Sequence, residues 1–134
     1  MCPSKIDDEI ASLIKRGVSV GLVEQGTQHF ARVIGLATPA PPWGAATHDI
    51  LIAIPIAYES AGLDAFYVSL PCLFNGGAHP RINGAKIEIG GVTWQLVSWH
   101  YPDEKRWIAG QDDLGNHIEH CRGFFLNRKA INAY

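Results

Sequence analysis

The sequence predicts an α+β domain in which one helix near each end packs on an antiparallel sheet. Apolar residues recur at helical spacing near both ends of the chain, which predicts two amphipathic helices. Between them, short runs rich in β-branched residues are separated by turns that contain glycine or proline, and this pattern is typical of antiparallel strands. We therefore expect a four-stranded antiparallel meander, a small additional hairpin and one domain spanning residues 1–134.

The first helix is expected over residues 6–16, just before Gly17, a residue type favoured where helices end. Apolar side chains fall on one stripe of this helix, and we expect the stripe to pack on the sheet. The stripe consists of Ile6, Ile10, Leu13 and Ile14.

The middle of the chain predicts strands and one irregular loop. Residues 49–54 are apolar at successive positions, as in a central strand covered on both faces. Gly90 and Gly91 form a pair typical of a tight hairpin turn. Three prolines exclude regular structure from 38–44, and we expect Trp43 in that loop to be half-buried. The predicted strands are 18–23, 29–36, 49–54, 65–70, 86–89 and 92–97.

The closing helix is expected to start after Asp112 or Asp113, whose carboxylates can accept hydrogen bonds from free amides. Leu114, Ile118, Cys121 and Phe125 form its apolar stripe. His117, His120 and Cys121 lie three and four residues apart, a spacing that zinc ligands also use. Because Cys121 belongs to the stripe and no second ligand cluster is visible, we expect a core cysteine, two surface histidines and no bound metal.

Composition limits the classes of partner. The 11 basic and 13 acidic residues form no long run of either sign, so we expect no nucleic-acid partner. The longest apolar run, 50–58, is far shorter than the roughly 20 residues that cross a bilayer, and a cytoplasmic protein without membrane contact is expected. Cys2, Cys72 and Cys121 are odd in number and irregularly spaced, which favours reduced thiols.

A functional site is expected within residues 94–114, where aromatic and polar reactive side chains are concentrated. A predicted strand ends there at the turn 101–103, so Ser98 and His100 immediately precede an irregular loop. Loops held by a scaffold are common places for reactive side chains. Three tryptophans in the same stretch are equally typical of core anchors, and they are Trp94, Trp99 and Trp107.

Several short motifs occur in order along residues 50–125. They are Ile54-Pro55-x-x-Tyr58, Phe66-Tyr67-Val68, Trp94-Gln95, Ser98-x-His100 and Trp107-x-x-Gly110-x-Asp112-x-Leu114. In order and spacing they resemble prokaryotic E2 family E, a divergent bacterial group of proteins similar to ubiquitin-conjugating enzymes. The resemblance implies a UBC (E2)-like fold, an E1-type activating enzyme and a ubiquitin-like modifier as partners, and no cofactor.

The chain departs from the E2 pattern at the catalytic position. E2 enzymes carry their cysteine eight residues before the tryptophan, and this chain has Trp99 there, between Ser98 and His100. Glu59 replaces a second proline. His79-Pro80 is similar to the histidine-proline-asparagine motif, but Arg81 follows, and a predicted hairpin separates Asn83 from the active-site position. The separation argues against Asn83 as an oxyanion donor.

Ser98 is the first candidate nucleophile and would form an oxyester, with His100 as general base. Side chains two residues apart on a strand lie on the same face of the sheet, and contact between Ser98 and His100 requires the strand to bend. Asp103 or Asp113 could orient His100 or the incoming amine, although capping or solvation explains either carboxylate. Cys72 is the alternative nucleophile, and a buried apolar role is equally typical of a free cysteine.

Three functions follow from these residues. The first is an E2-like component of a bacterial ubiquitin-like modification pathway, which carries or positions the activated modifier for transfer to an amine. The second is a non-catalytic E2-like adaptor, which the missing cysteine favours. The third is an unrelated metal-dependent hydrolase that uses the histidines.

Overall fold

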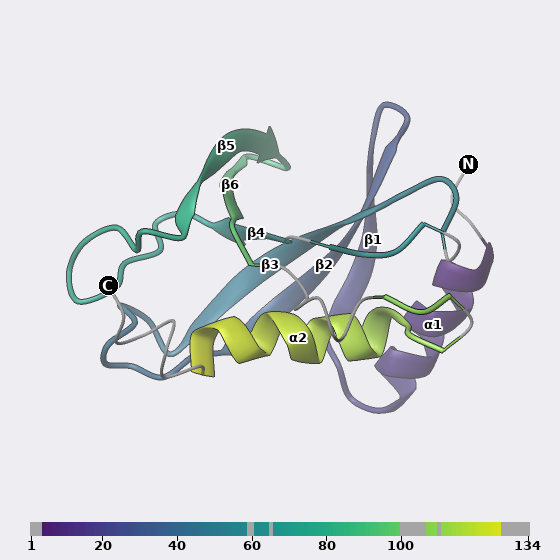
Figure 1. The fold of residues 1–134 in the computed structure, drawn as a ribbon, viewed down its shortest axis with the longest axis horizontal. Coiled ribbons are helices and arrows are strands. Elements are labelled where there is room, and N and C mark those ends of the chain that lie inside the picture. Colours follow the sequence, from purple (N-terminus) through teal and green to yellow (C-terminus); the bar gives the residue numbers. More distant parts are fainter. Residues whose placement is uncertain (1–3, 59–60, 65, 100–106, 110, 127–134) are drawn as a thin grey trace.

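The fold is known from a computed structural model, which describes residues 4–58, 61–64, 66–99, 107–109 and 111–126. Two helices flank a single sheet, and the chain runs from α1 through the strands to α2 (Figure 1). The elements are α1 (Ser4–Lys15), β1 (Val20–Gln25), β2 (Gln28–Ala37), β3 (Thr47–Ile54), β4 (Phe66–Ser69), β5 (Ile82–Ile89), β6 (Val92–Val97) and α2 (Leu114–Leu126).

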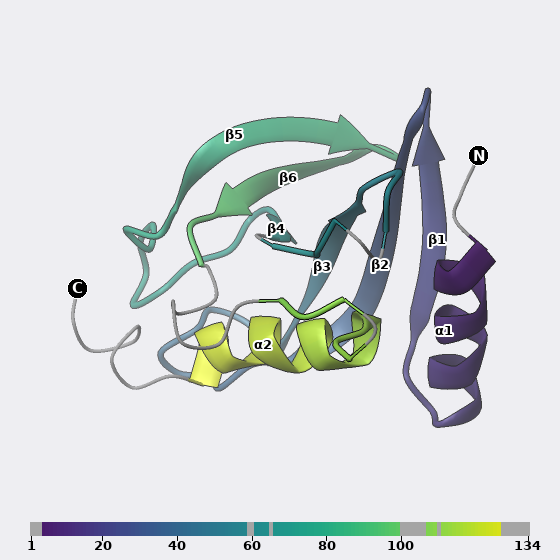
Figure 2. The same ribbon diagram turned by 45° about the vertical axis from the view of Figure 1, so that its right-hand side comes forward.

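The first predicted helix is confirmed, with one correction to its apolar stripe. Ile6, Ile10 and Leu13 are buried, but Ile14 is 54% exposed. The reason is the position of α1, which lies alongside the edge strand β1 and contacts α2 (Figure 2). A helix at the edge of a sheet buries a narrower stripe than a helix laid across the sheet.

The sheet has six antiparallel strands in the order β1-β2-β3-β4-β6-β5. The predicted four-stranded meander is confirmed, and β3 lies inside the sheet as expected. The small hairpin is not a separate unit, because β6 pairs with β4. β5 also begins at Ile82, before the predicted start at 86. Gly84 allows this early pairing, since a Cβ there would lie 2.6 Å from Leu96 Cβ.

The two faces of the sheet bury two separate apolar clusters. Ile50 and Ile52 point into the main core beneath the helices, whereas Leu51 packs on the opposite face with Phe30 and Trp94. The β5–β6 hairpin arches over that opposite face (Figure 2). We expected residues 49–54 to be covered on both faces of the sheet. On the face opposite the main core this is confirmed for Leu51, which is buried, but not for Ala53, which is exposed.

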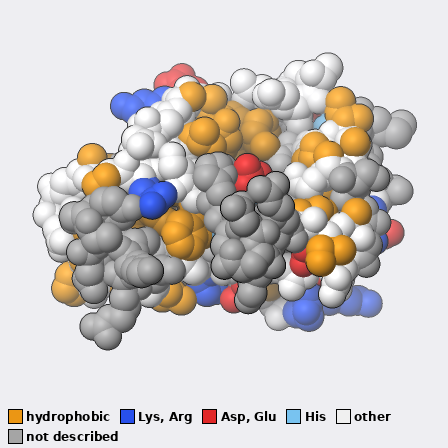
Figure 3. Space-filling view, in the orientation of Figure 1, with side chains coloured by type: hydrophobic (Ala, Val, Ile, Leu, Met, Phe, Trp, Pro, Cys, Tyr) orange, Lys and Arg blue, Asp and Glu red, His pale blue; other side chains and the backbone are white. Residues whose placement is uncertain are grey.

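The closing helix α2 confirms its predicted stripe. Leu114, Ile118, Cys121 and Phe125 are all buried in the main core. Among the described residues, neither helix combines the length and the apolar character needed to span a membrane. On the face shown in Figure 3, acidic and basic side chains lie close to one another at several points among separate apolar groups.

Trp43 is far more buried than its proline-rich loop suggests. Only 2% of the residue is exposed, so the expectation of half-burial is wrong. Its ring stacks on His79 at 5.5 Å and meets the rings of Phe74 and Phe125 at 5.0 and 4.9 Å. The indole Nε1 donates to the carbonyl oxygen of Phe125 at 3.1 Å. The loop therefore contributes the centre of an aromatic cluster.

Glu9 joins α1 to the start of α2. Its Oε1 accepts hydrogen bonds from the backbone N–H of Leu114 at 2.7 Å and from the hydroxyl of Tyr58 at 2.6 Å. A carboxylate at a helix N-terminus satisfies a free amide and interacts favourably with the helix dipole. The side chain of one helix thus caps the other.

We expect Glu9→Ala to lower the free energy of unfolding by about 1–2 kcal/mol, because donors on two buried residues, Leu114 and Tyr58, lose their acceptor. Urea denaturation measures the change. Asp8→Ala removes the neighbouring carboxylate, which is exposed, and serves as the matched control. Equal stability of the two variants would contradict the capping role.

Candidate functional site

Ser98 lies where β6 ends, and its hydroxyl points toward β5. Its Oγ donates to Asn83 Oδ1 at 2.9 Å, at a solvent-exposed position. Its backbone N–H donates to the carbonyl oxygen of Arg81 at 2.7 Å. Ser98 is partly exposed, and the hydrogen bond to Asn83 holds its hydroxyl in one orientation.

Asn83 is close to Ser98, contrary to the expectation that the hairpin separates them. The hairpin itself brings them together, because its strands run back along each other. Regular pairing counted outward from the Gly90-Gly91 turn does not hold at this end of the hairpin, where Ile82 pairs with Val97. An irregularity between Ile82 and Lys86 shifts the pairing and brings Arg81 level with Ser98.

Arg81 contacts Ser98 through both its backbone and its side chain. The guanidinium NH1 donates to the carbonyl oxygen of Ser98 at 3.3 Å. The backbone N–H of Arg81 donates to Nδ1 of His79 at 3.0 Å, and His79 is only 1% exposed. A buried histidine therefore anchors the turn that presents Arg81. In the sequence, Arg81 stands out only as a departure from the E2 motif.

Trp99, the residue at which the resemblance places the E2 cysteine, packs within the fold. Its indole Nε1 donates to the carbonyl oxygen of His120 at 2.9 Å. Its ring stacks on the His120 ring at 5.8 Å and meets Phe124 edge-on at 5.6 Å. The side chain is directed onto α2, so it fixes the chain that follows Ser98 against this helix.

Two of the motifs contact each other. Tyr58 closes a turn by donating its backbone N–H to Pro55, and its ring lies 5.7 Å from the ring of Trp107. Asp112 Oδ2 accepts a hydrogen bond from the backbone N–H of Ile108 at 2.7 Å and shapes the entry to α2. The motif around Tyr58 and the motif that begins at Trp107 thus pack together.

The family model described as prokaryotic E2 family E matches residues 6–125, which is most of the chain. The chain belongs to prokaryotic E2 family E. Membership supports an E2-like role in a bacterial ubiquitin-like pathway. Searches of curated proteins and of solved structures gave no match.

The other candidate site residues of this chain are Asp113, His100 and Asp103. Asp113 caps α2, with Oδ1 accepting from the backbone N–H of Asn116 at 2.8 Å. His100 and Asp103 lie outside the described residues, so the structure does not place them beside Ser98 or Asp113.

Cys72, the alternative candidate nucleophile, is buried in the main core with 5% exposure. Burial raises the pKa of its thiol to about 12, which leaves very little thiolate at neutral pH. Cys72 and Cys121 are both free thiols, as predicted, whereas Cys2 lies outside the described residues.

The histidines of α2 do not both lie on the surface. His117 is fully buried, which corrects the expectation, because its position on the helix faces the core between Leu114 and Ile118. His120 is partly covered by the Trp99 ring. Among the described residues of this family E chain, no group of three or more His, Cys, Asp and Glu side chains is arranged to hold a metal ion.

His117 makes stability depend on pH. Burial, followed by the charge of His120, lowers its pKa to about 3 from an ordinary 6.5, although Asp64 opposes the shift. Between these values the unfolded chain binds a proton that the folded chain does not, so stability falls as pH falls through this window. We expect a loss of about 2–3 kcal/mol between pH 7 and pH 4.5.

Urea unfolding across this pH range tests the prediction, and His117→Gln should flatten the dependence. Some slope should persist in that variant, because burial also lowers the pKa of His48 against the opposing charge of Asp49. Identical slopes for the wild-type protein and His117→Gln would refute the assignment.

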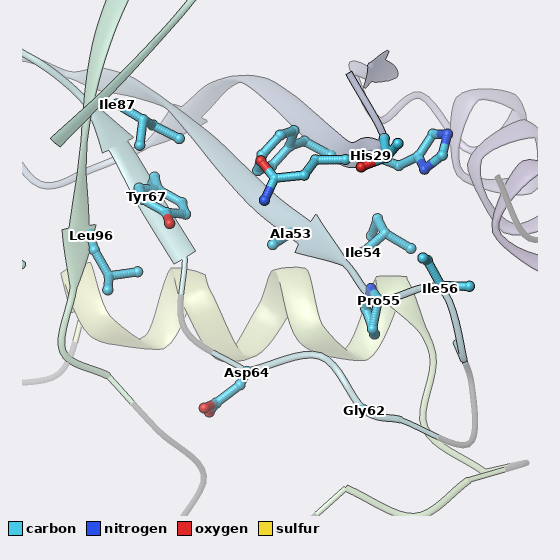
Figure 4. A pocket seen from close by; sticks show the side chains of 13 residues that line it. His29, Ala53, Ile54, Pro55, Ile56, Gly62, Asp64, Tyr67, Ile87 and Leu96 are labelled. Atoms are coloured by element: carbon cyan, nitrogen blue, oxygen red, sulfur yellow. The ribbon is translucent and has the colours of Figure 1, made fainter. Parts of the chain in front are cut away.

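An open pocket of about 610 Å³ lies on the sheet face turned away from α2 (Figure 4). Ala53, Tyr67, Ile87 and Leu96 contribute apolar walls from four strands. Ser98 does not line this pocket, so the pocket is distinct from the candidate site around Ser98.

Proposed function

We propose that this protein is an E2-like acyl carrier that forms an oxyester through Ser98 and transfers a ubiquitin-like modifier to an amine. The observation that carries the proposal is the hydroxyl of the partly exposed Ser98, which Asn83 orients just after the end of β6. It neighbours Trp99, the position at which E2 enzymes place their cysteine. Cys72 supports the choice of serine by contrast, because its thiol is buried and its pKa is raised to about 12.

The proposed loading step starts from a thioester of the modifier on an E1-type activating enzyme. Ser98 Oγ attacks the acyl carbon, the Oγ–C bond forms and the C–S bond breaks. His100 accepts the hydroxyl proton and delivers it to the departing thiolate. In the second step an amine displaces Oγ, and the proton that the amine loses returns to Ser98. Asp113 is the proposed carboxylate that orients His100 or the amine.

A non-catalytic adaptor is the second candidate, and Trp99 favours it. The indole of Trp99 donates a hydrogen bond to the carbonyl of His120 and stacks on the His120 ring. The side chain at this position therefore has a structural role. An adaptor would bind the modifier or another pathway component without any covalent step.

The two functions differ in whether a covalent adduct forms. The protein would be incubated with its activating enzyme, the modifier and ATP, and then analysed by intact mass. The carrier predicts an adduct that resists thiols and is cleaved by hydroxylamine or mild base. Binding of the modifier without any adduct would establish the adaptor and exclude the carrier.

A further inference from the structure

We infer that Asn83 is a site of spontaneous deamidation and that the Ser98 hydroxyl promotes the reaction. Deamidation replaces the side-chain amide of an asparagine with a carboxylate, and it proceeds most readily where glycine follows the asparagine. The sequence has two such pairs, Asn75-Gly76 and Asn83-Gly84. Because Ser98 acts here only as a hydrogen-bond donor, the inference does not depend on acylation of that serine.

The reaction begins when the backbone nitrogen of Gly84 loses its proton to hydroxide and attacks Cγ of Asn83. The bond between that nitrogen and Cγ forms, and the side-chain oxygen Oδ1 carries the negative charge. The bond between Cγ and Nδ2 then breaks, and the departing nitrogen takes a proton from water and leaves as ammonia. Water opens the resulting succinimide by adding to one of its carbonyl carbons and breaking the bond from that carbon to the Gly84 nitrogen. The product has aspartate or isoaspartate at position 83.

The contact between Ser98 and Asn83 matches the charge that develops in this reaction. Ser98 Oγ donates to Asn83 Oδ1 at 2.9 Å, and Oδ1 is the atom that becomes the oxyanion. A donor already placed at that oxygen stabilises the addition step more than the starting amide, because a hydrogen bond to a charged acceptor is stronger. The backbone N–H of Ser98 donates to the carbonyl of Arg81 at 2.7 Å, which holds the serine beside the start of β5.

The backbone around Asn83 departs from regular strand pairing. In a regular strand the side chain stands roughly perpendicular to the sheet and the ladder fixes the next backbone nitrogen, so the two stay apart. The register of the β5–β6 pairing shifts between Ile82 and Lys86, and residues 83–85 fall within this irregularity. Such an irregularity disrupts the ladder locally, and Gly84 has no Cβ to shield its nitrogen. The attack therefore meets less restraint here than in a regular strand.

Solvent reaches the reacting amide. Asn83 is exposed and Gly84 is partly exposed, which admits the hydroxide and water that the reaction consumes. Nδ2 of Asn83 makes no hydrogen bond to another residue in the described part of the chain, so no described side chain retains the departing nitrogen.

Deamidation changes the candidate site in one defined way. The acceptor of the Ser98 hydroxyl becomes a carboxylate, and hydrogen bonds to charged acceptors are shorter and stronger than those to neutral amides. The site thus acquires a negative charge that the sequence does not encode.

The test follows both Asn-Gly pairs by peptide mapping and mass spectrometry while the folded protein is kept at neutral pH. Ser98→Ala removes the donor, whereas Ser98→Thr keeps a hydroxyl. Asn83→Gln keeps an amide that would have to close a larger ring. Asn75 is the internal control, because its side chain accepts no hydrogen bond from a hydroxyl of the described residues. The measurements are repeated in urea, where the contact of Ser98 with Asn83 is lost.

We expect Ser98→Ala to slow deamidation at Asn83 about tenfold, because one hydrogen bond to the developing oxyanion is lost, and to leave the rate at Asn75 unchanged. Ser98→Thr should stay close to wild type, and Asn83→Gln should give no product at position 83 over the same period. In urea, Ser98→Ala should match the wild-type rate at both sites.

Three results would overturn the inference. The first is the absence of product at Asn83 in the folded wild-type protein when the unfolded chain forms it, which would show that the fold protects the amide. The second is an equal or faster rate at Asn83 in folded Ser98→Ala. The third is a loss of rate in Ser98→Thr as large as that in Ser98→Ala, because the hydroxyl would then not be the cause.

Discussion

Ser98→Ala is expected to abolish the covalent adduct while leaving the free energy of unfolding within about 1 kcal/mol of the wild-type value. The substitution removes the proposed nucleophile, so no acyl group can be attached. Structurally it removes one exposed hydrogen bond, to Asn83 Oδ1, and exposed polar contacts contribute little to stability. Intact mass after incubation with activating enzyme, modifier and ATP measures the effect.

Two further serine variants sharpen this prediction. Ser98→Cys should restore an adduct that thiols now cleave, because the ester becomes a thioester. Ser12→Ala removes an exposed serine from α1 and should load normally. If Ser98→Ala still forms the adduct and Cys72→Ser does not, the assignment of the nucleophile is wrong, although membership of the family is unaffected.

Trp43→Ala is expected to lower the free energy of unfolding by about 3–5 kcal/mol, a large part of the stability of a domain this size. The ring contacts Phe74, His79 and Phe125, so its removal leaves a cavity lined by aromatic groups. The carbonyl of Phe125 also loses its indole donor. Urea denaturation followed by circular dichroism measures the loss.

Two further variants, Trp43→Phe and Ile56→Ala, separate the loss of ring packing from the loss of the indole N–H and from the effect of truncating an exposed side chain. Phenylalanine keeps most of the ring packing and loses the indole N–H, so its cost should be clearly smaller than that of alanine. Ile56 is 76% exposed, and its truncation should change stability by less than about 0.5 kcal/mol. A cost for Trp43→Ala no larger than that for Ile56→Ala would contradict the central position of this tryptophan.

Local patterns in the sequence determined both helices, the four-strand meander and the family. Helical spacing placed Ile6, Ile10 and Leu13 in the core correctly, because a single amphipathic face needs only one neighbouring surface. Continuous apolar character placed β3 inside the sheet. Each family motif is short and local, and their order along residues 50–125 indicated the family that the match over residues 6–125 shows.

Only the tertiary structure decided which distant side chains meet. Trp43 is buried because the stretch between β4 and β5 and the helix α2 converge on its ring, and a proline-rich loop carries no periodic signal of such a position. His117 is buried for a similar reason, since the width of the buried face of α2 depends on what packs against it. The contact of Ser98 with Asn83 and Arg81 depends on an irregular strand register, and strand pairing is a long-range interaction that local sequence patterns do not encode.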